Sequence, residues 1–509
     1  MPARNPQNTL SAVSGRSFFR ATAILLGLGV VLKAVGAVQQ ALLAALFGAG
    51  PELDAYFVAV ALPNLLIYFL VLGPLGLMLA HSAEGDDQPS SIRRALLTDT
   101  LIVSAVLTCI GVLVAPWLTG LIAPGFDSDT GGMATNMLRL AMPAVGLAAV
   151  NALPRGAFHG AGDFVVPTVA YILSIVILIA TMLALFPSIR VYGAAAGMIA
   201  GALGAFVFQW LIARSRGMQL TLGAPEWSGR VRAVVFPMLG VSLAFAAIQA
   251  TGLWARMYAS GLGSGAIALL DYSLGFDKVI AGLTAVSAAT AVYPALAAGT
   301  AADTASHIRY SLRNVVLTSL PPTAFLVALR EPAIQLWLER GRFAPADAAV
   351  VSELLLLLSP ALFAWALAYP VLYAFHALSK GARPAGYTVI GLAVGALLTY
   401  FLTGWWALPG IAIGVSLTAC GTMLGLLMLL GREVPGLWSR SFFGFLLKVC
   451  LVSALGAGVA GFSWAPDALL LDLIVRAALG GSIFLLGLWF SGIEEAQFFA
   501  GWLRRRIRG

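Results

Sequence analysis

Long apolar stretches separated by short polar loops divide this chain, and they constrain its fold more than any other feature. Each stretch is long enough to cross the roughly 30 Å of hydrocarbon in a bilayer. Because lipid offers no hydrogen-bond partners, a spanning segment of this length satisfies its backbone as an α-helix. Fourteen such stretches lie at about residues 18–47, 55–81, 93–122, 133–158, 164–187, 191–214, 230–257, 265–297, 308–338, 346–379, 384–403, 407–431, 441–463 and 468–491. The sequence therefore predicts an all-α polytopic membrane protein.

Composition agrees with a membrane protein and argues against a nucleic-acid partner. Hydrophobic residues make up 60% of the 509 residues and charged residues only 10%, whereas soluble globular chains are about 25% charged. The mean hydropathy is +0.92. The 30 Lys and Arg residues outnumber the 22 Asp and Glu residues, but they fall in the short loops between apolar stretches. No basic patch is interleaved with aromatic side chains, so we expect no nucleic-acid binding.

The distribution of cations predicts the orientation of the chain in the membrane. If the N-terminus is cytoplasmic, twenty Lys and Arg residues lie in cytoplasmic segments and six on the opposite side. The remaining four lie in or at the edge of spans. This asymmetry follows the positive-inside rule and predicts that both termini are cytoplasmic. The first apolar run is too long for the hydrophobic region of a signal peptide, so we interpret it as a retained span.

The chain is expected to divide into two six-helix lobes and two further helices. The expected units are a cytoplasmic tail at 1–17, a lobe at 18–215, a cytoplasmic linker at 216–229, a lobe at 230–431, two additional spans at 432–493 and a basic cytoplasmic tail at 494–509. In both lobes the first span leads into a Gly-rich turn with an Asp and a nearby Tyr, GAGPELDAY and GLGSGAIALLDY. Repeated bundles are common in transporters, which bind substrate between the repeats.

Residues that carry catalytic or metal chemistry are scarce. The three cysteines and four histidines stand far apart, without CxxC or any other metal-ligand spacing. The motifs GxSxG, HExxH and the P-loop are absent from the sequence, so we expect no enzyme activity, cofactor or metal. Without a nucleotide-binding motif, uphill transport would use a coupling ion, the membrane potential or a partner.

A charged side chain and an interrupted helix mark the first two spans as a candidate substrate site. Lys33 lies well inside the first span, too deep to reach water easily through lipid. The segment 47–66, FGAGPELDAYFVAVALPNLL, opens the second span with Asp54 and then interrupts it with Pro63 and Asn64. Charge and broken backbone are costly beside lipid and typically line a water-filled path. We therefore expect these residues to face a cavity.

The eighth span is the most polar one and is expected to form another wall of that cavity. Asp277 and Lys278 are neighbours in sequence and point about 100° apart on a helix, so at least one should address the cavity. Arg256 lies near the external end of the seventh span, where anchoring at the membrane interface is the simplest role. Asp472 and Arg476 have the i, i+4 spacing of a structural ion pair.

Residues 47–66 closely resemble the first hairpin of the MurJ/MviN family, whose pattern runs like FGAG…DAFFVA…LPNLLRR. The stretch 115–126, APWLTGLIAPGF, is similar to the third span and following loop of that family. Fourteen spans in two six-helix lobes with two extra helices agree over nearly the whole chain. The resemblance implies the multidrug/oligosaccharidyl-lipid/polysaccharide (MOP) exporter superfamily. It also implies flipping of an undecaprenyl-pyrophosphate-linked saccharide, typically lipid II, from the cytoplasmic to the periplasmic leaflet of the bacterial inner membrane.

The functional residues of that family are carried over only in part. Asp54, Pro63 and Asn64 match, and Lys33 occupies the place of a family arginine, which keeps the charge but not the bidentate geometry. Family arginines or their flanking motifs are replaced at Gln39–Gln40, Ala45, Ile67–Tyr68, Val71–Gly76 and Gly275, and Lys278 stands where an acid is usual. The resemblance therefore implies a cavity that is less cationic than the family pattern.

The resemblance also implies a mechanism, in which rocking of the two lobes exposes a cavity lined by spans one, two, seven and eight to alternate sides. The expected substrate-binding residues are Lys33, Asp54, Asn64, Arg256, Asp277 and Lys278. The expected partners are a lipid-linked oligosaccharide and membrane lipid, and the protein is expected to act as a monomer.

Three other functions are compatible with the same residues. An exopolysaccharide or O-antigen repeat-unit flippase is favoured by the lost arginines, because pyrophosphate recognition favours Arg. A cation-coupled drug exporter would use acids such as Asp54, Asp271 and Asp277. A non-transporting scaffold that recruits glycosyltransferases would depend on its loops and not on its cavity.

Overall fold

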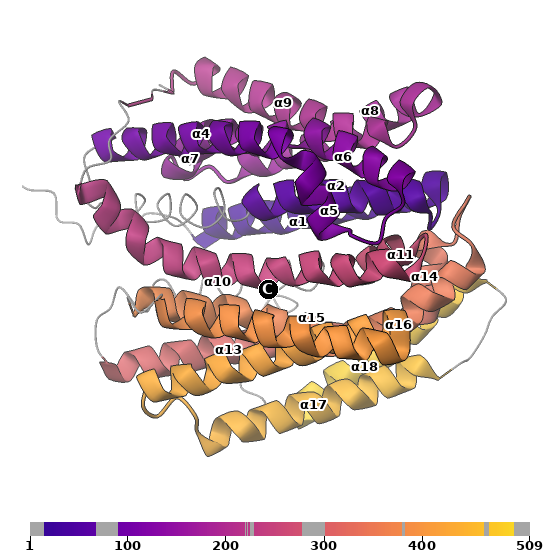
Figure 1. The fold of residues 1–509 in the computed structure, drawn as a ribbon. Coiled ribbons are helices and arrows are strands. Elements are labelled where there is room, and N and C mark those ends of the chain that lie inside the picture. The colour runs from indigo at the N-terminus through magenta and orange to yellow at the C-terminus, as the bar shows by residue number, and fades with distance from the viewer. Residues whose placement is uncertain are drawn as a thin grey trace, which may run out of the picture.

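The computed structural model describes residues 15–67, 90–218, 220, 222–223, 229–276, 301–378, 382–462 and 468–492. Within these ranges the regular elements are helices, and no strand occurs. The all-α class predicted from the apolar pattern is confirmed. Figure 1 shows the helices running roughly along one common direction, as expected of a bundle that crosses a membrane.

The N-terminal half forms the upper layer of the bundle in Figure 1. Its helices are α1 (Gly15–Phe47), α2 (Pro51–Ile67), α4 (Ser90–Leu113), α5 (Ala115–Ile122), α6 (Ser128–Ala141), α7 (Pro143–Gly160), α8 (Val165–Ile189) and α9 (Tyr192–Ser215). Helix α2 lies at the centre of the molecule, since every residue from Leu53 to Ala61 is buried. The apolar sequence of α2 is therefore explained by contact with protein on all sides.

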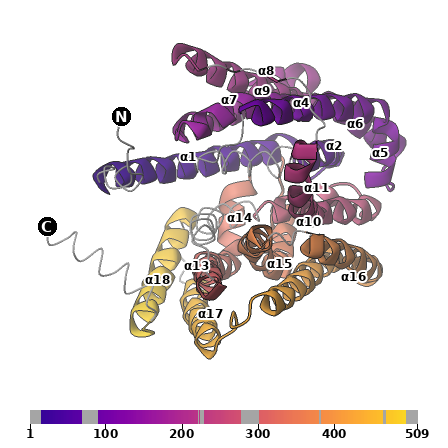
Figure 2. The ribbon, with the colours of Figure 1, turned by 90° about the vertical axis from the view of Figure 1, so that its left-hand side faces the viewer.

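The C-terminal half forms the lower layer, with its first helix along the boundary between the two (Figure 1). Its helices are α10 (Gly229–Ala259), the short η4 (Ser260–Leu262), α11 (Ala266–Leu274), α13 (Ala301–Ala328), α14 (Arg330–Leu338), α15 (Pro345–Ala377), α16 (Ala382–Glu433), α17 (Arg440–Gly461) and α18 (Leu469–Phe490). Figure 2 shows α17 and α18 on the outside of this half, beside α13.

The described part of the chain contains eight helices long and apolar enough to cross a membrane, or up to ten if two bent pairs each count as one span. One of the eight, α16, contains two predicted spans. They are separated at Ala407, where the backbone leaves the helical conformation. Other predicted spans, such as 55–81 and 265–297, fall partly outside the described residues. The count of fourteen spans stays a prediction.

Two local distortions recur in the two halves at corresponding places. Helices α4 and α5 meet at a bend of 77°, and α13 and α14 at a bend of 79°. Later in each half, one residue reverses the chain with nearly the same dihedral angles: Arg190 between α8 and α9 (φ 49°, ψ −125°) and Ala407 within α16 (φ 49°, ψ −127°). This correspondence supports the internal repeat that the two Gly-rich turns indicated.

Small residues pack the helices tightly after each of these reversals. A Cβ atom at Gly201 of α9 would lie 2.3 Å from the carbonyl oxygen of Ser174 on α8. In α16, a Cβ atom at Gly410 would lie 2.2 Å from the carbonyl oxygen of Leu402. Only glycine lets the backbones approach this closely, which is a common means of helix association in lipid.

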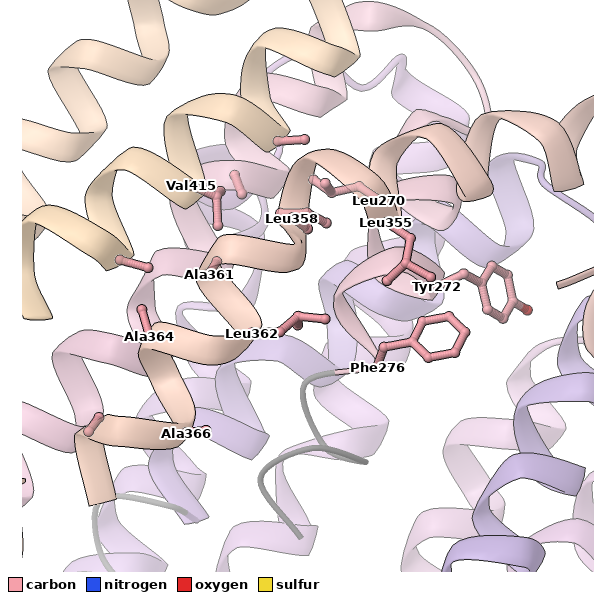
Figure 3. Close-up of a cluster of buried hydrophobic side chains, with 14 of the residues drawn as sticks. Leu270, Tyr272, Phe276, Leu355, Leu358, Ala361, Leu362, Ala364, Ala366 and Val415 are labelled. Atoms are coloured by element: carbon pink, nitrogen blue, oxygen red, sulfur yellow. The ribbon is translucent and has the colours of Figure 1, made fainter. Parts of the chain in front are cut away.

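The largest cluster of buried side chains among the described residues extends from α2 in the N-terminal half to α11, α15 and α16 in the C-terminal half. Figure 3 shows Leu270 and Tyr272 of α11 beside Leu355 and Leu358 of α15, with Val415 of α16 nearby. Leu270, Leu355, Leu358 and Val415 are fully buried. Because α15 is enclosed by α11, α13, α14 and α16, it is the central scaffold of the C-terminal half.

Candidate functional site

Asp54 joins the two halves by capping a helix of the opposite half. It lies on α2 and is only 2% exposed. Its carboxylate accepts hydrogen bonds from the backbone N–H groups of Gly265 (2.6 Å to Oδ2) and Ala268 (2.7 Å to Oδ1), at the start of α11. The first N–H groups of a helix have no partner within it, and a carboxylate suits the positive end of its dipole. Asp54 therefore supplies α11 with a cap that its own half does not provide.

Backbone contacts join the halves around the same point. The N–H of Gly125, after α5, donates to Ser260 Oγ of η4 at 3.0 Å, and a Cβ atom at Gly125 would lie 2.6 Å from Gly261 Cα. The N–H of Arg342, in the turn between α14 and α15, donates to the carbonyl oxygen of Ala45 at 2.9 Å. We call this end of the bundle the closed end; it lies on the right in Figure 1.

Aromatic side chains fill the interior behind these contacts. Phe57 of α2 meets the ring of Tyr272 of α11 edge to face at 5.6 Å between centroids, and Tyr272 meets Phe343 in the same way at 5.4 Å. Tyr272 is 1% exposed. Edge-to-face packing of buried rings excludes water, so the closed end is sealed by side chains from both halves.

Each half contains one ion pair that stabilises the closed end. Arg256 of α10 donates through Nε to Asp271 Oδ2 of α11 at 2.8 Å, and its Nη2 also reaches the same carboxylate. Arg190 donates through Nη2 to Glu52 Oε2 at 2.9 Å, which ties the α8–α9 reversal to the start of α2. The first pair is largely buried and the second is partly exposed, so the first contributes more to local rigidity.

At the opposite end, which we call the open end, the polar contacts of Arg216 and Arg309 each stay within one half. Arg216 donates to Asp163 Oδ2 at 2.7 Å, and both belong to the N-terminal half. Arg309 donates to the carbonyl oxygen of Leu437 at 3.0 Å, and both belong to the C-terminal half. Hydrogen bonds that join described residues of the two halves include those of Asp54, Gly125, Trp337 and Arg342.

Helix α1 changes character between the two ends. Near the closed end, Leu43, Ala44 and Phe47 are buried, and Phe47 packs on Phe186 of α8. Toward the open end its side chains are exposed in several directions, among them Val30 (70%) and Lys33. In Figure 2 this part of α1 lies at the edge of the bundle. This part of α1 is therefore packed against protein less closely than its last turns are.

The structure separates the predicted site residues into two groups. Asp54 and Arg256 lie at the closed end, where each has a defined partner. Lys33 lies fourteen residues before the end of α1, which corresponds to about 21 Å along a helix. Asn64 is half-buried on α2. Asp277 and Lys278 lie outside the described residues, so their place in the cavity stays a prediction.

The sequence reasoning missed the residues that join the halves through their backbone. Gly125 and Ala45 were not candidates, because a backbone contact does not require a distinctive side chain, and Ser260, which accepts through its Oγ, was not a candidate either. The only signal was the glycine content of APGF around Gly125 and of GLGSG around Gly263. Within the described residues, no group of three or more His, Cys, Asp or Glu side chains is arranged to hold a metal ion.

Comparison with known protein families and sequences gives a consistent result. The family model described as "Lipid II flippase MurJ" matches residues 43–466. The "Lipid II flippase MurJ" of Burkholderia cenocepacia is 25% identical over 531 residues, covering 97% of this chain and 100% of that protein. The "Probable lipid II flippase MurJ" of Vibrio cholerae is 24% identical over 510 residues, covering 92% and 95%.

Solved structures show the same fold. A structure of "Lipid II flippase MurJ, inward closed conformation" matches with a TM-score of 0.74 at 17% identity, covering 92% of this chain and 98% of that one. An inward-facing multidrug resistance MATE family transporter of the MOP superfamily matches with a TM-score of 0.59 at 15% identity, covering 82% and 98%. The order and packing of the helices are therefore shared beyond close relatives.

Proposed function

Because this chain belongs to the lipid II flippase MurJ family, we propose that it moves lipid II from the cytoplasmic to the periplasmic leaflet of the bacterial inner membrane. The observation that carries the proposal, beyond the family, is the difference between the two ends of the bundle. Asp54 and three backbone or side-chain contacts join the halves at the closed end, whereas α1 stands exposed toward the open end. A cavity that opens to one side at a time is what a flippase needs.

The energies of the closed-end contacts suit a reversible closure. Each hydrogen bond between the halves contributes about 0.5–1.5 kcal/mol net, and those to a carboxylate roughly 1.5–3 kcal/mol. Their sum is on the order of several kcal/mol, which is comparable to the differential binding energy needed to shift a two-state equilibrium from one side to the other. We therefore propose alternating access in which these contacts break as the halves rock.

We assign the predicted site residues to two roles. Lys33 is the proposed contact for the pyrophosphate, with Asn64 and the predicted Asp277 and Lys278 on the other walls of the cavity. Asp54 is assigned to closure because its two oxygens are occupied by backbone N–H groups. Arg256 is assigned to the same end because its guanidinium is paired with Asp271.

A cation-coupled drug exporter of the same fold is less well supported. Such an exporter would bind a cationic drug through cavity carboxylates. Asp54 and Asp271 are the best acids for that task among the described residues, and both already have partners. An exopolysaccharide or O-antigen flippase uses the same architecture, and only the identity of the saccharide separates it from our proposal.

The proposal includes an orientation and a mode of action. Both termini are placed in the cytoplasm by the excess of cations in the predicted cytoplasmic segments, so that the closed end faces the periplasm. The protein acts as a monomer, without enzymatic chemistry. Uphill movement is driven by a coupling ion or by the membrane potential.

The test is replacement of the resident lipid II flippase in depleted cells, with lipid II labelled by a reagent that reaches only the outer leaflet. The intact chain should restore labelling. Lys33→Ala should reduce the rate by roughly ten- to hundredfold, because a charge-assisted hydrogen bond contributes about 1.5–3 kcal/mol. Lys33→Arg should retain most activity, and Val30→Ala, on the same exposed part of α1, should retain all of it.

Two results would contradict the proposal. If the intact chain leaves lipid II unlabelled but restores export of an O-antigen repeat unit, the saccharide assignment is wrong. If Lys33→Ala translocates every lipid-linked saccharide tested at the normal rate, the phosphate contact lies elsewhere.

A further inference from the structure

A second hollow lies in the C-terminal half, away from the interface between the halves. It is a pocket of about 600 Å³ between α13, α15 and α17, which Figure 2 shows grouped in that half. Its walls are mainly apolar and include Leu320, Ala324, Val327, Phe363, Ala457 and Gly458. No residue of α1, α2 or α11 lines it. The pocket is therefore separate from the proposed transport cavity.

Unequal packing on the two sides of α17 produces this pocket. On one side, neighbouring residues occupy the space beside Gly456: a Cβ atom there would lie 2.9 Å from Phe484 Cβ and 3.1 Å from the ring of Phe325. On the other side, Gly458 is exposed and a Cβ atom there would meet nothing within 4 Å. Phe325 thus fills one side of the α13–α17 contact, while the side at Ala324 and Gly458 is left hollow.

One charged side chain lies at the rim of the pocket. Arg330 stands at the bend between α13 and α14, where the span ends at the closed end, and its side chain is 27% exposed. Its Nη1 donates to the carbonyl oxygen of Val327 at 2.9 Å, and its Nη2 to Glu331 Oε1 at 3.0 Å. A guanidinium has five N–H donors, and an ion pair with the 67% exposed Glu331 is weak. Arg330 can therefore bind a further anion.

We propose that this pocket binds a phospholipid, with an acyl chain between α13 and α17 and its phosphate at Arg330. Gly458 lines the pocket and is exposed, so an acyl chain can enter there beside apolar walls. Water is a poor occupant of this pocket, because its mainly apolar walls offer few hydrogen-bond partners. An arginine at the depth where a span ends matches the level of the lipid phosphates. The polyprenyl chain of a transported lipid is the competing occupant, but no described residue of α1 or α2 lines the pocket.

The experiment uses the full-length protein, purified from a membrane and analysed by native mass spectrometry with added phosphatidylglycerol or undecaprenyl phosphate. We expect the intact protein to retain one phosphatidylglycerol through the detergent removal step. Gly458→Leu, which fills the pocket, should lower the retained fraction at least fivefold. Gly444→Leu, on the same helix and equally free of neighbours, is the matched control and should retain the lipid. Arg330→Gln should lower retention at least threefold.

The outcomes separate the possibilities without reference to transport. Preferential retention of undecaprenyl phosphate over phosphatidylglycerol, or equal retention by Gly458→Leu and Gly444→Leu, would overturn the proposal. If Gly458→Leu does not elute as a folded protein, Ala324→Phe fills the pocket from α13 and takes its place. Loss of flippase activity in cells would have no bearing on this result, because the readout is lipid retention alone.

Discussion

The two ends of this bundle are held together by different kinds of contact. At the closed end the halves meet through Asp54 at the start of α11 and through backbone groups of Gly125 and Arg342. At the open end, the ion pair of Arg216 with Asp163 and the hydrogen bond of Arg309 to Leu437 each stay inside one half. In this state the named contacts hold the two halves together at the closed end. The difference teaches that closure combines a buried carboxylate with places where backbones of the two halves approach each other closely.

The largest loss of stability at the closed end is expected from disrupting the buried ion pair Arg256–Asp271. Arg256→Met leaves the carboxylate of Asp271, whose side chain is 8% exposed, without its partner. Removing one member of a buried pair typically costs about 3–5 kcal/mol. We expect a clear fall in the thermal unfolding midpoint in detergent, measured by tryptophan fluorescence.

The double variant Arg256→Met with Asp271→Leu is the control, because it removes both charges. It should recover most of the loss, since an apolar pair of similar size can replace a buried ion pair. A single variant as stable as the natural protein would show that the pair is not essential to the closed end.

Asp54 tests whether the cap on α11 holds the halves together. Asp54→Ala leaves two N–H groups without an acceptor, and we expect it to weaken closure by roughly 2–4 kcal/mol. Asp54→Asn keeps one oxygen and should lose about half as much. Hydrogen–deuterium exchange of residues 263–268 in nanodiscs should be faster in Asp54→Asn than in the natural protein, and fastest in Asp54→Ala. Unchanged exchange in both variants would mean that closure does not depend on the cap.

Gly125 tests the close approach of the backbones. A methyl group at Gly125 would meet Gly261 and Ser260 at 2.6 Å, whereas one at Gly261 would meet nothing within 4 Å. Gly125→Ala should therefore oppose closure by about 1–3 kcal/mol, the cost of overpacking. Gly261→Ala, on the other side of the same contact, should change little. Spin-label distances across the closed end would measure the shift, and equal distances in both variants would contradict it.

The smallest effect is expected at the open end, from the pH dependence of Asp163. Burial raises the pKa of this carboxyl, but the hydrogen bonds from Arg216 and from the N–H groups of Val166 and Val165 outweigh it and hold the pKa below its ordinary value. The stabilisation is therefore present above the pKa of the unfolded chain and is lost as the pH falls through the lower folded value. Hydrogen exchange at the start of α8 should rise on acidification, and Asp163→Asn should abolish this dependence.

Much of the fold could be predicted because apolar length alone determines how a chain sits in lipid. The ion pair of Asp472 with Arg476 is confirmed, with 2.7 Å between Oδ1 and Nε, because an i, i+4 pair depends only on the helix itself. The break between the spans at 384–403 and 407–431 is confirmed at Ala407. Asn151, by contrast, bridges α7 to α9 by donating to the carbonyl oxygen of Ala202, and this contact depends on the packing of two helices and not on one helix alone.

The bends inside two predicted spans were not expected. The stretches 93–122 and 308–338 were each predicted as one helix, but each is broken by more than 70°. Proline follows closely on both breaks, at Pro116 and Pro332. Proline is favoured in the first turn of a new helix as well as at a kink. The sequence therefore marked the positions, but only packing against the rest of the bundle determined that the chain turns sharply there.

By itself, the sequence determined that this protein is an all-helical membrane protein, because hydrophobic length acts over short stretches of chain, and its glycine-rich turns predicted an internal repeat. The tertiary structure decided what the charged residues do. Asp54 was a cavity candidate from sequence and caps helix α11, whose N-cap residue Gly265 lies 211 residues later in the chain. The reason is physical: a carboxylate binds whichever N–H groups the fold brings to it, and the fold alone determines which residues distant in sequence become neighbours.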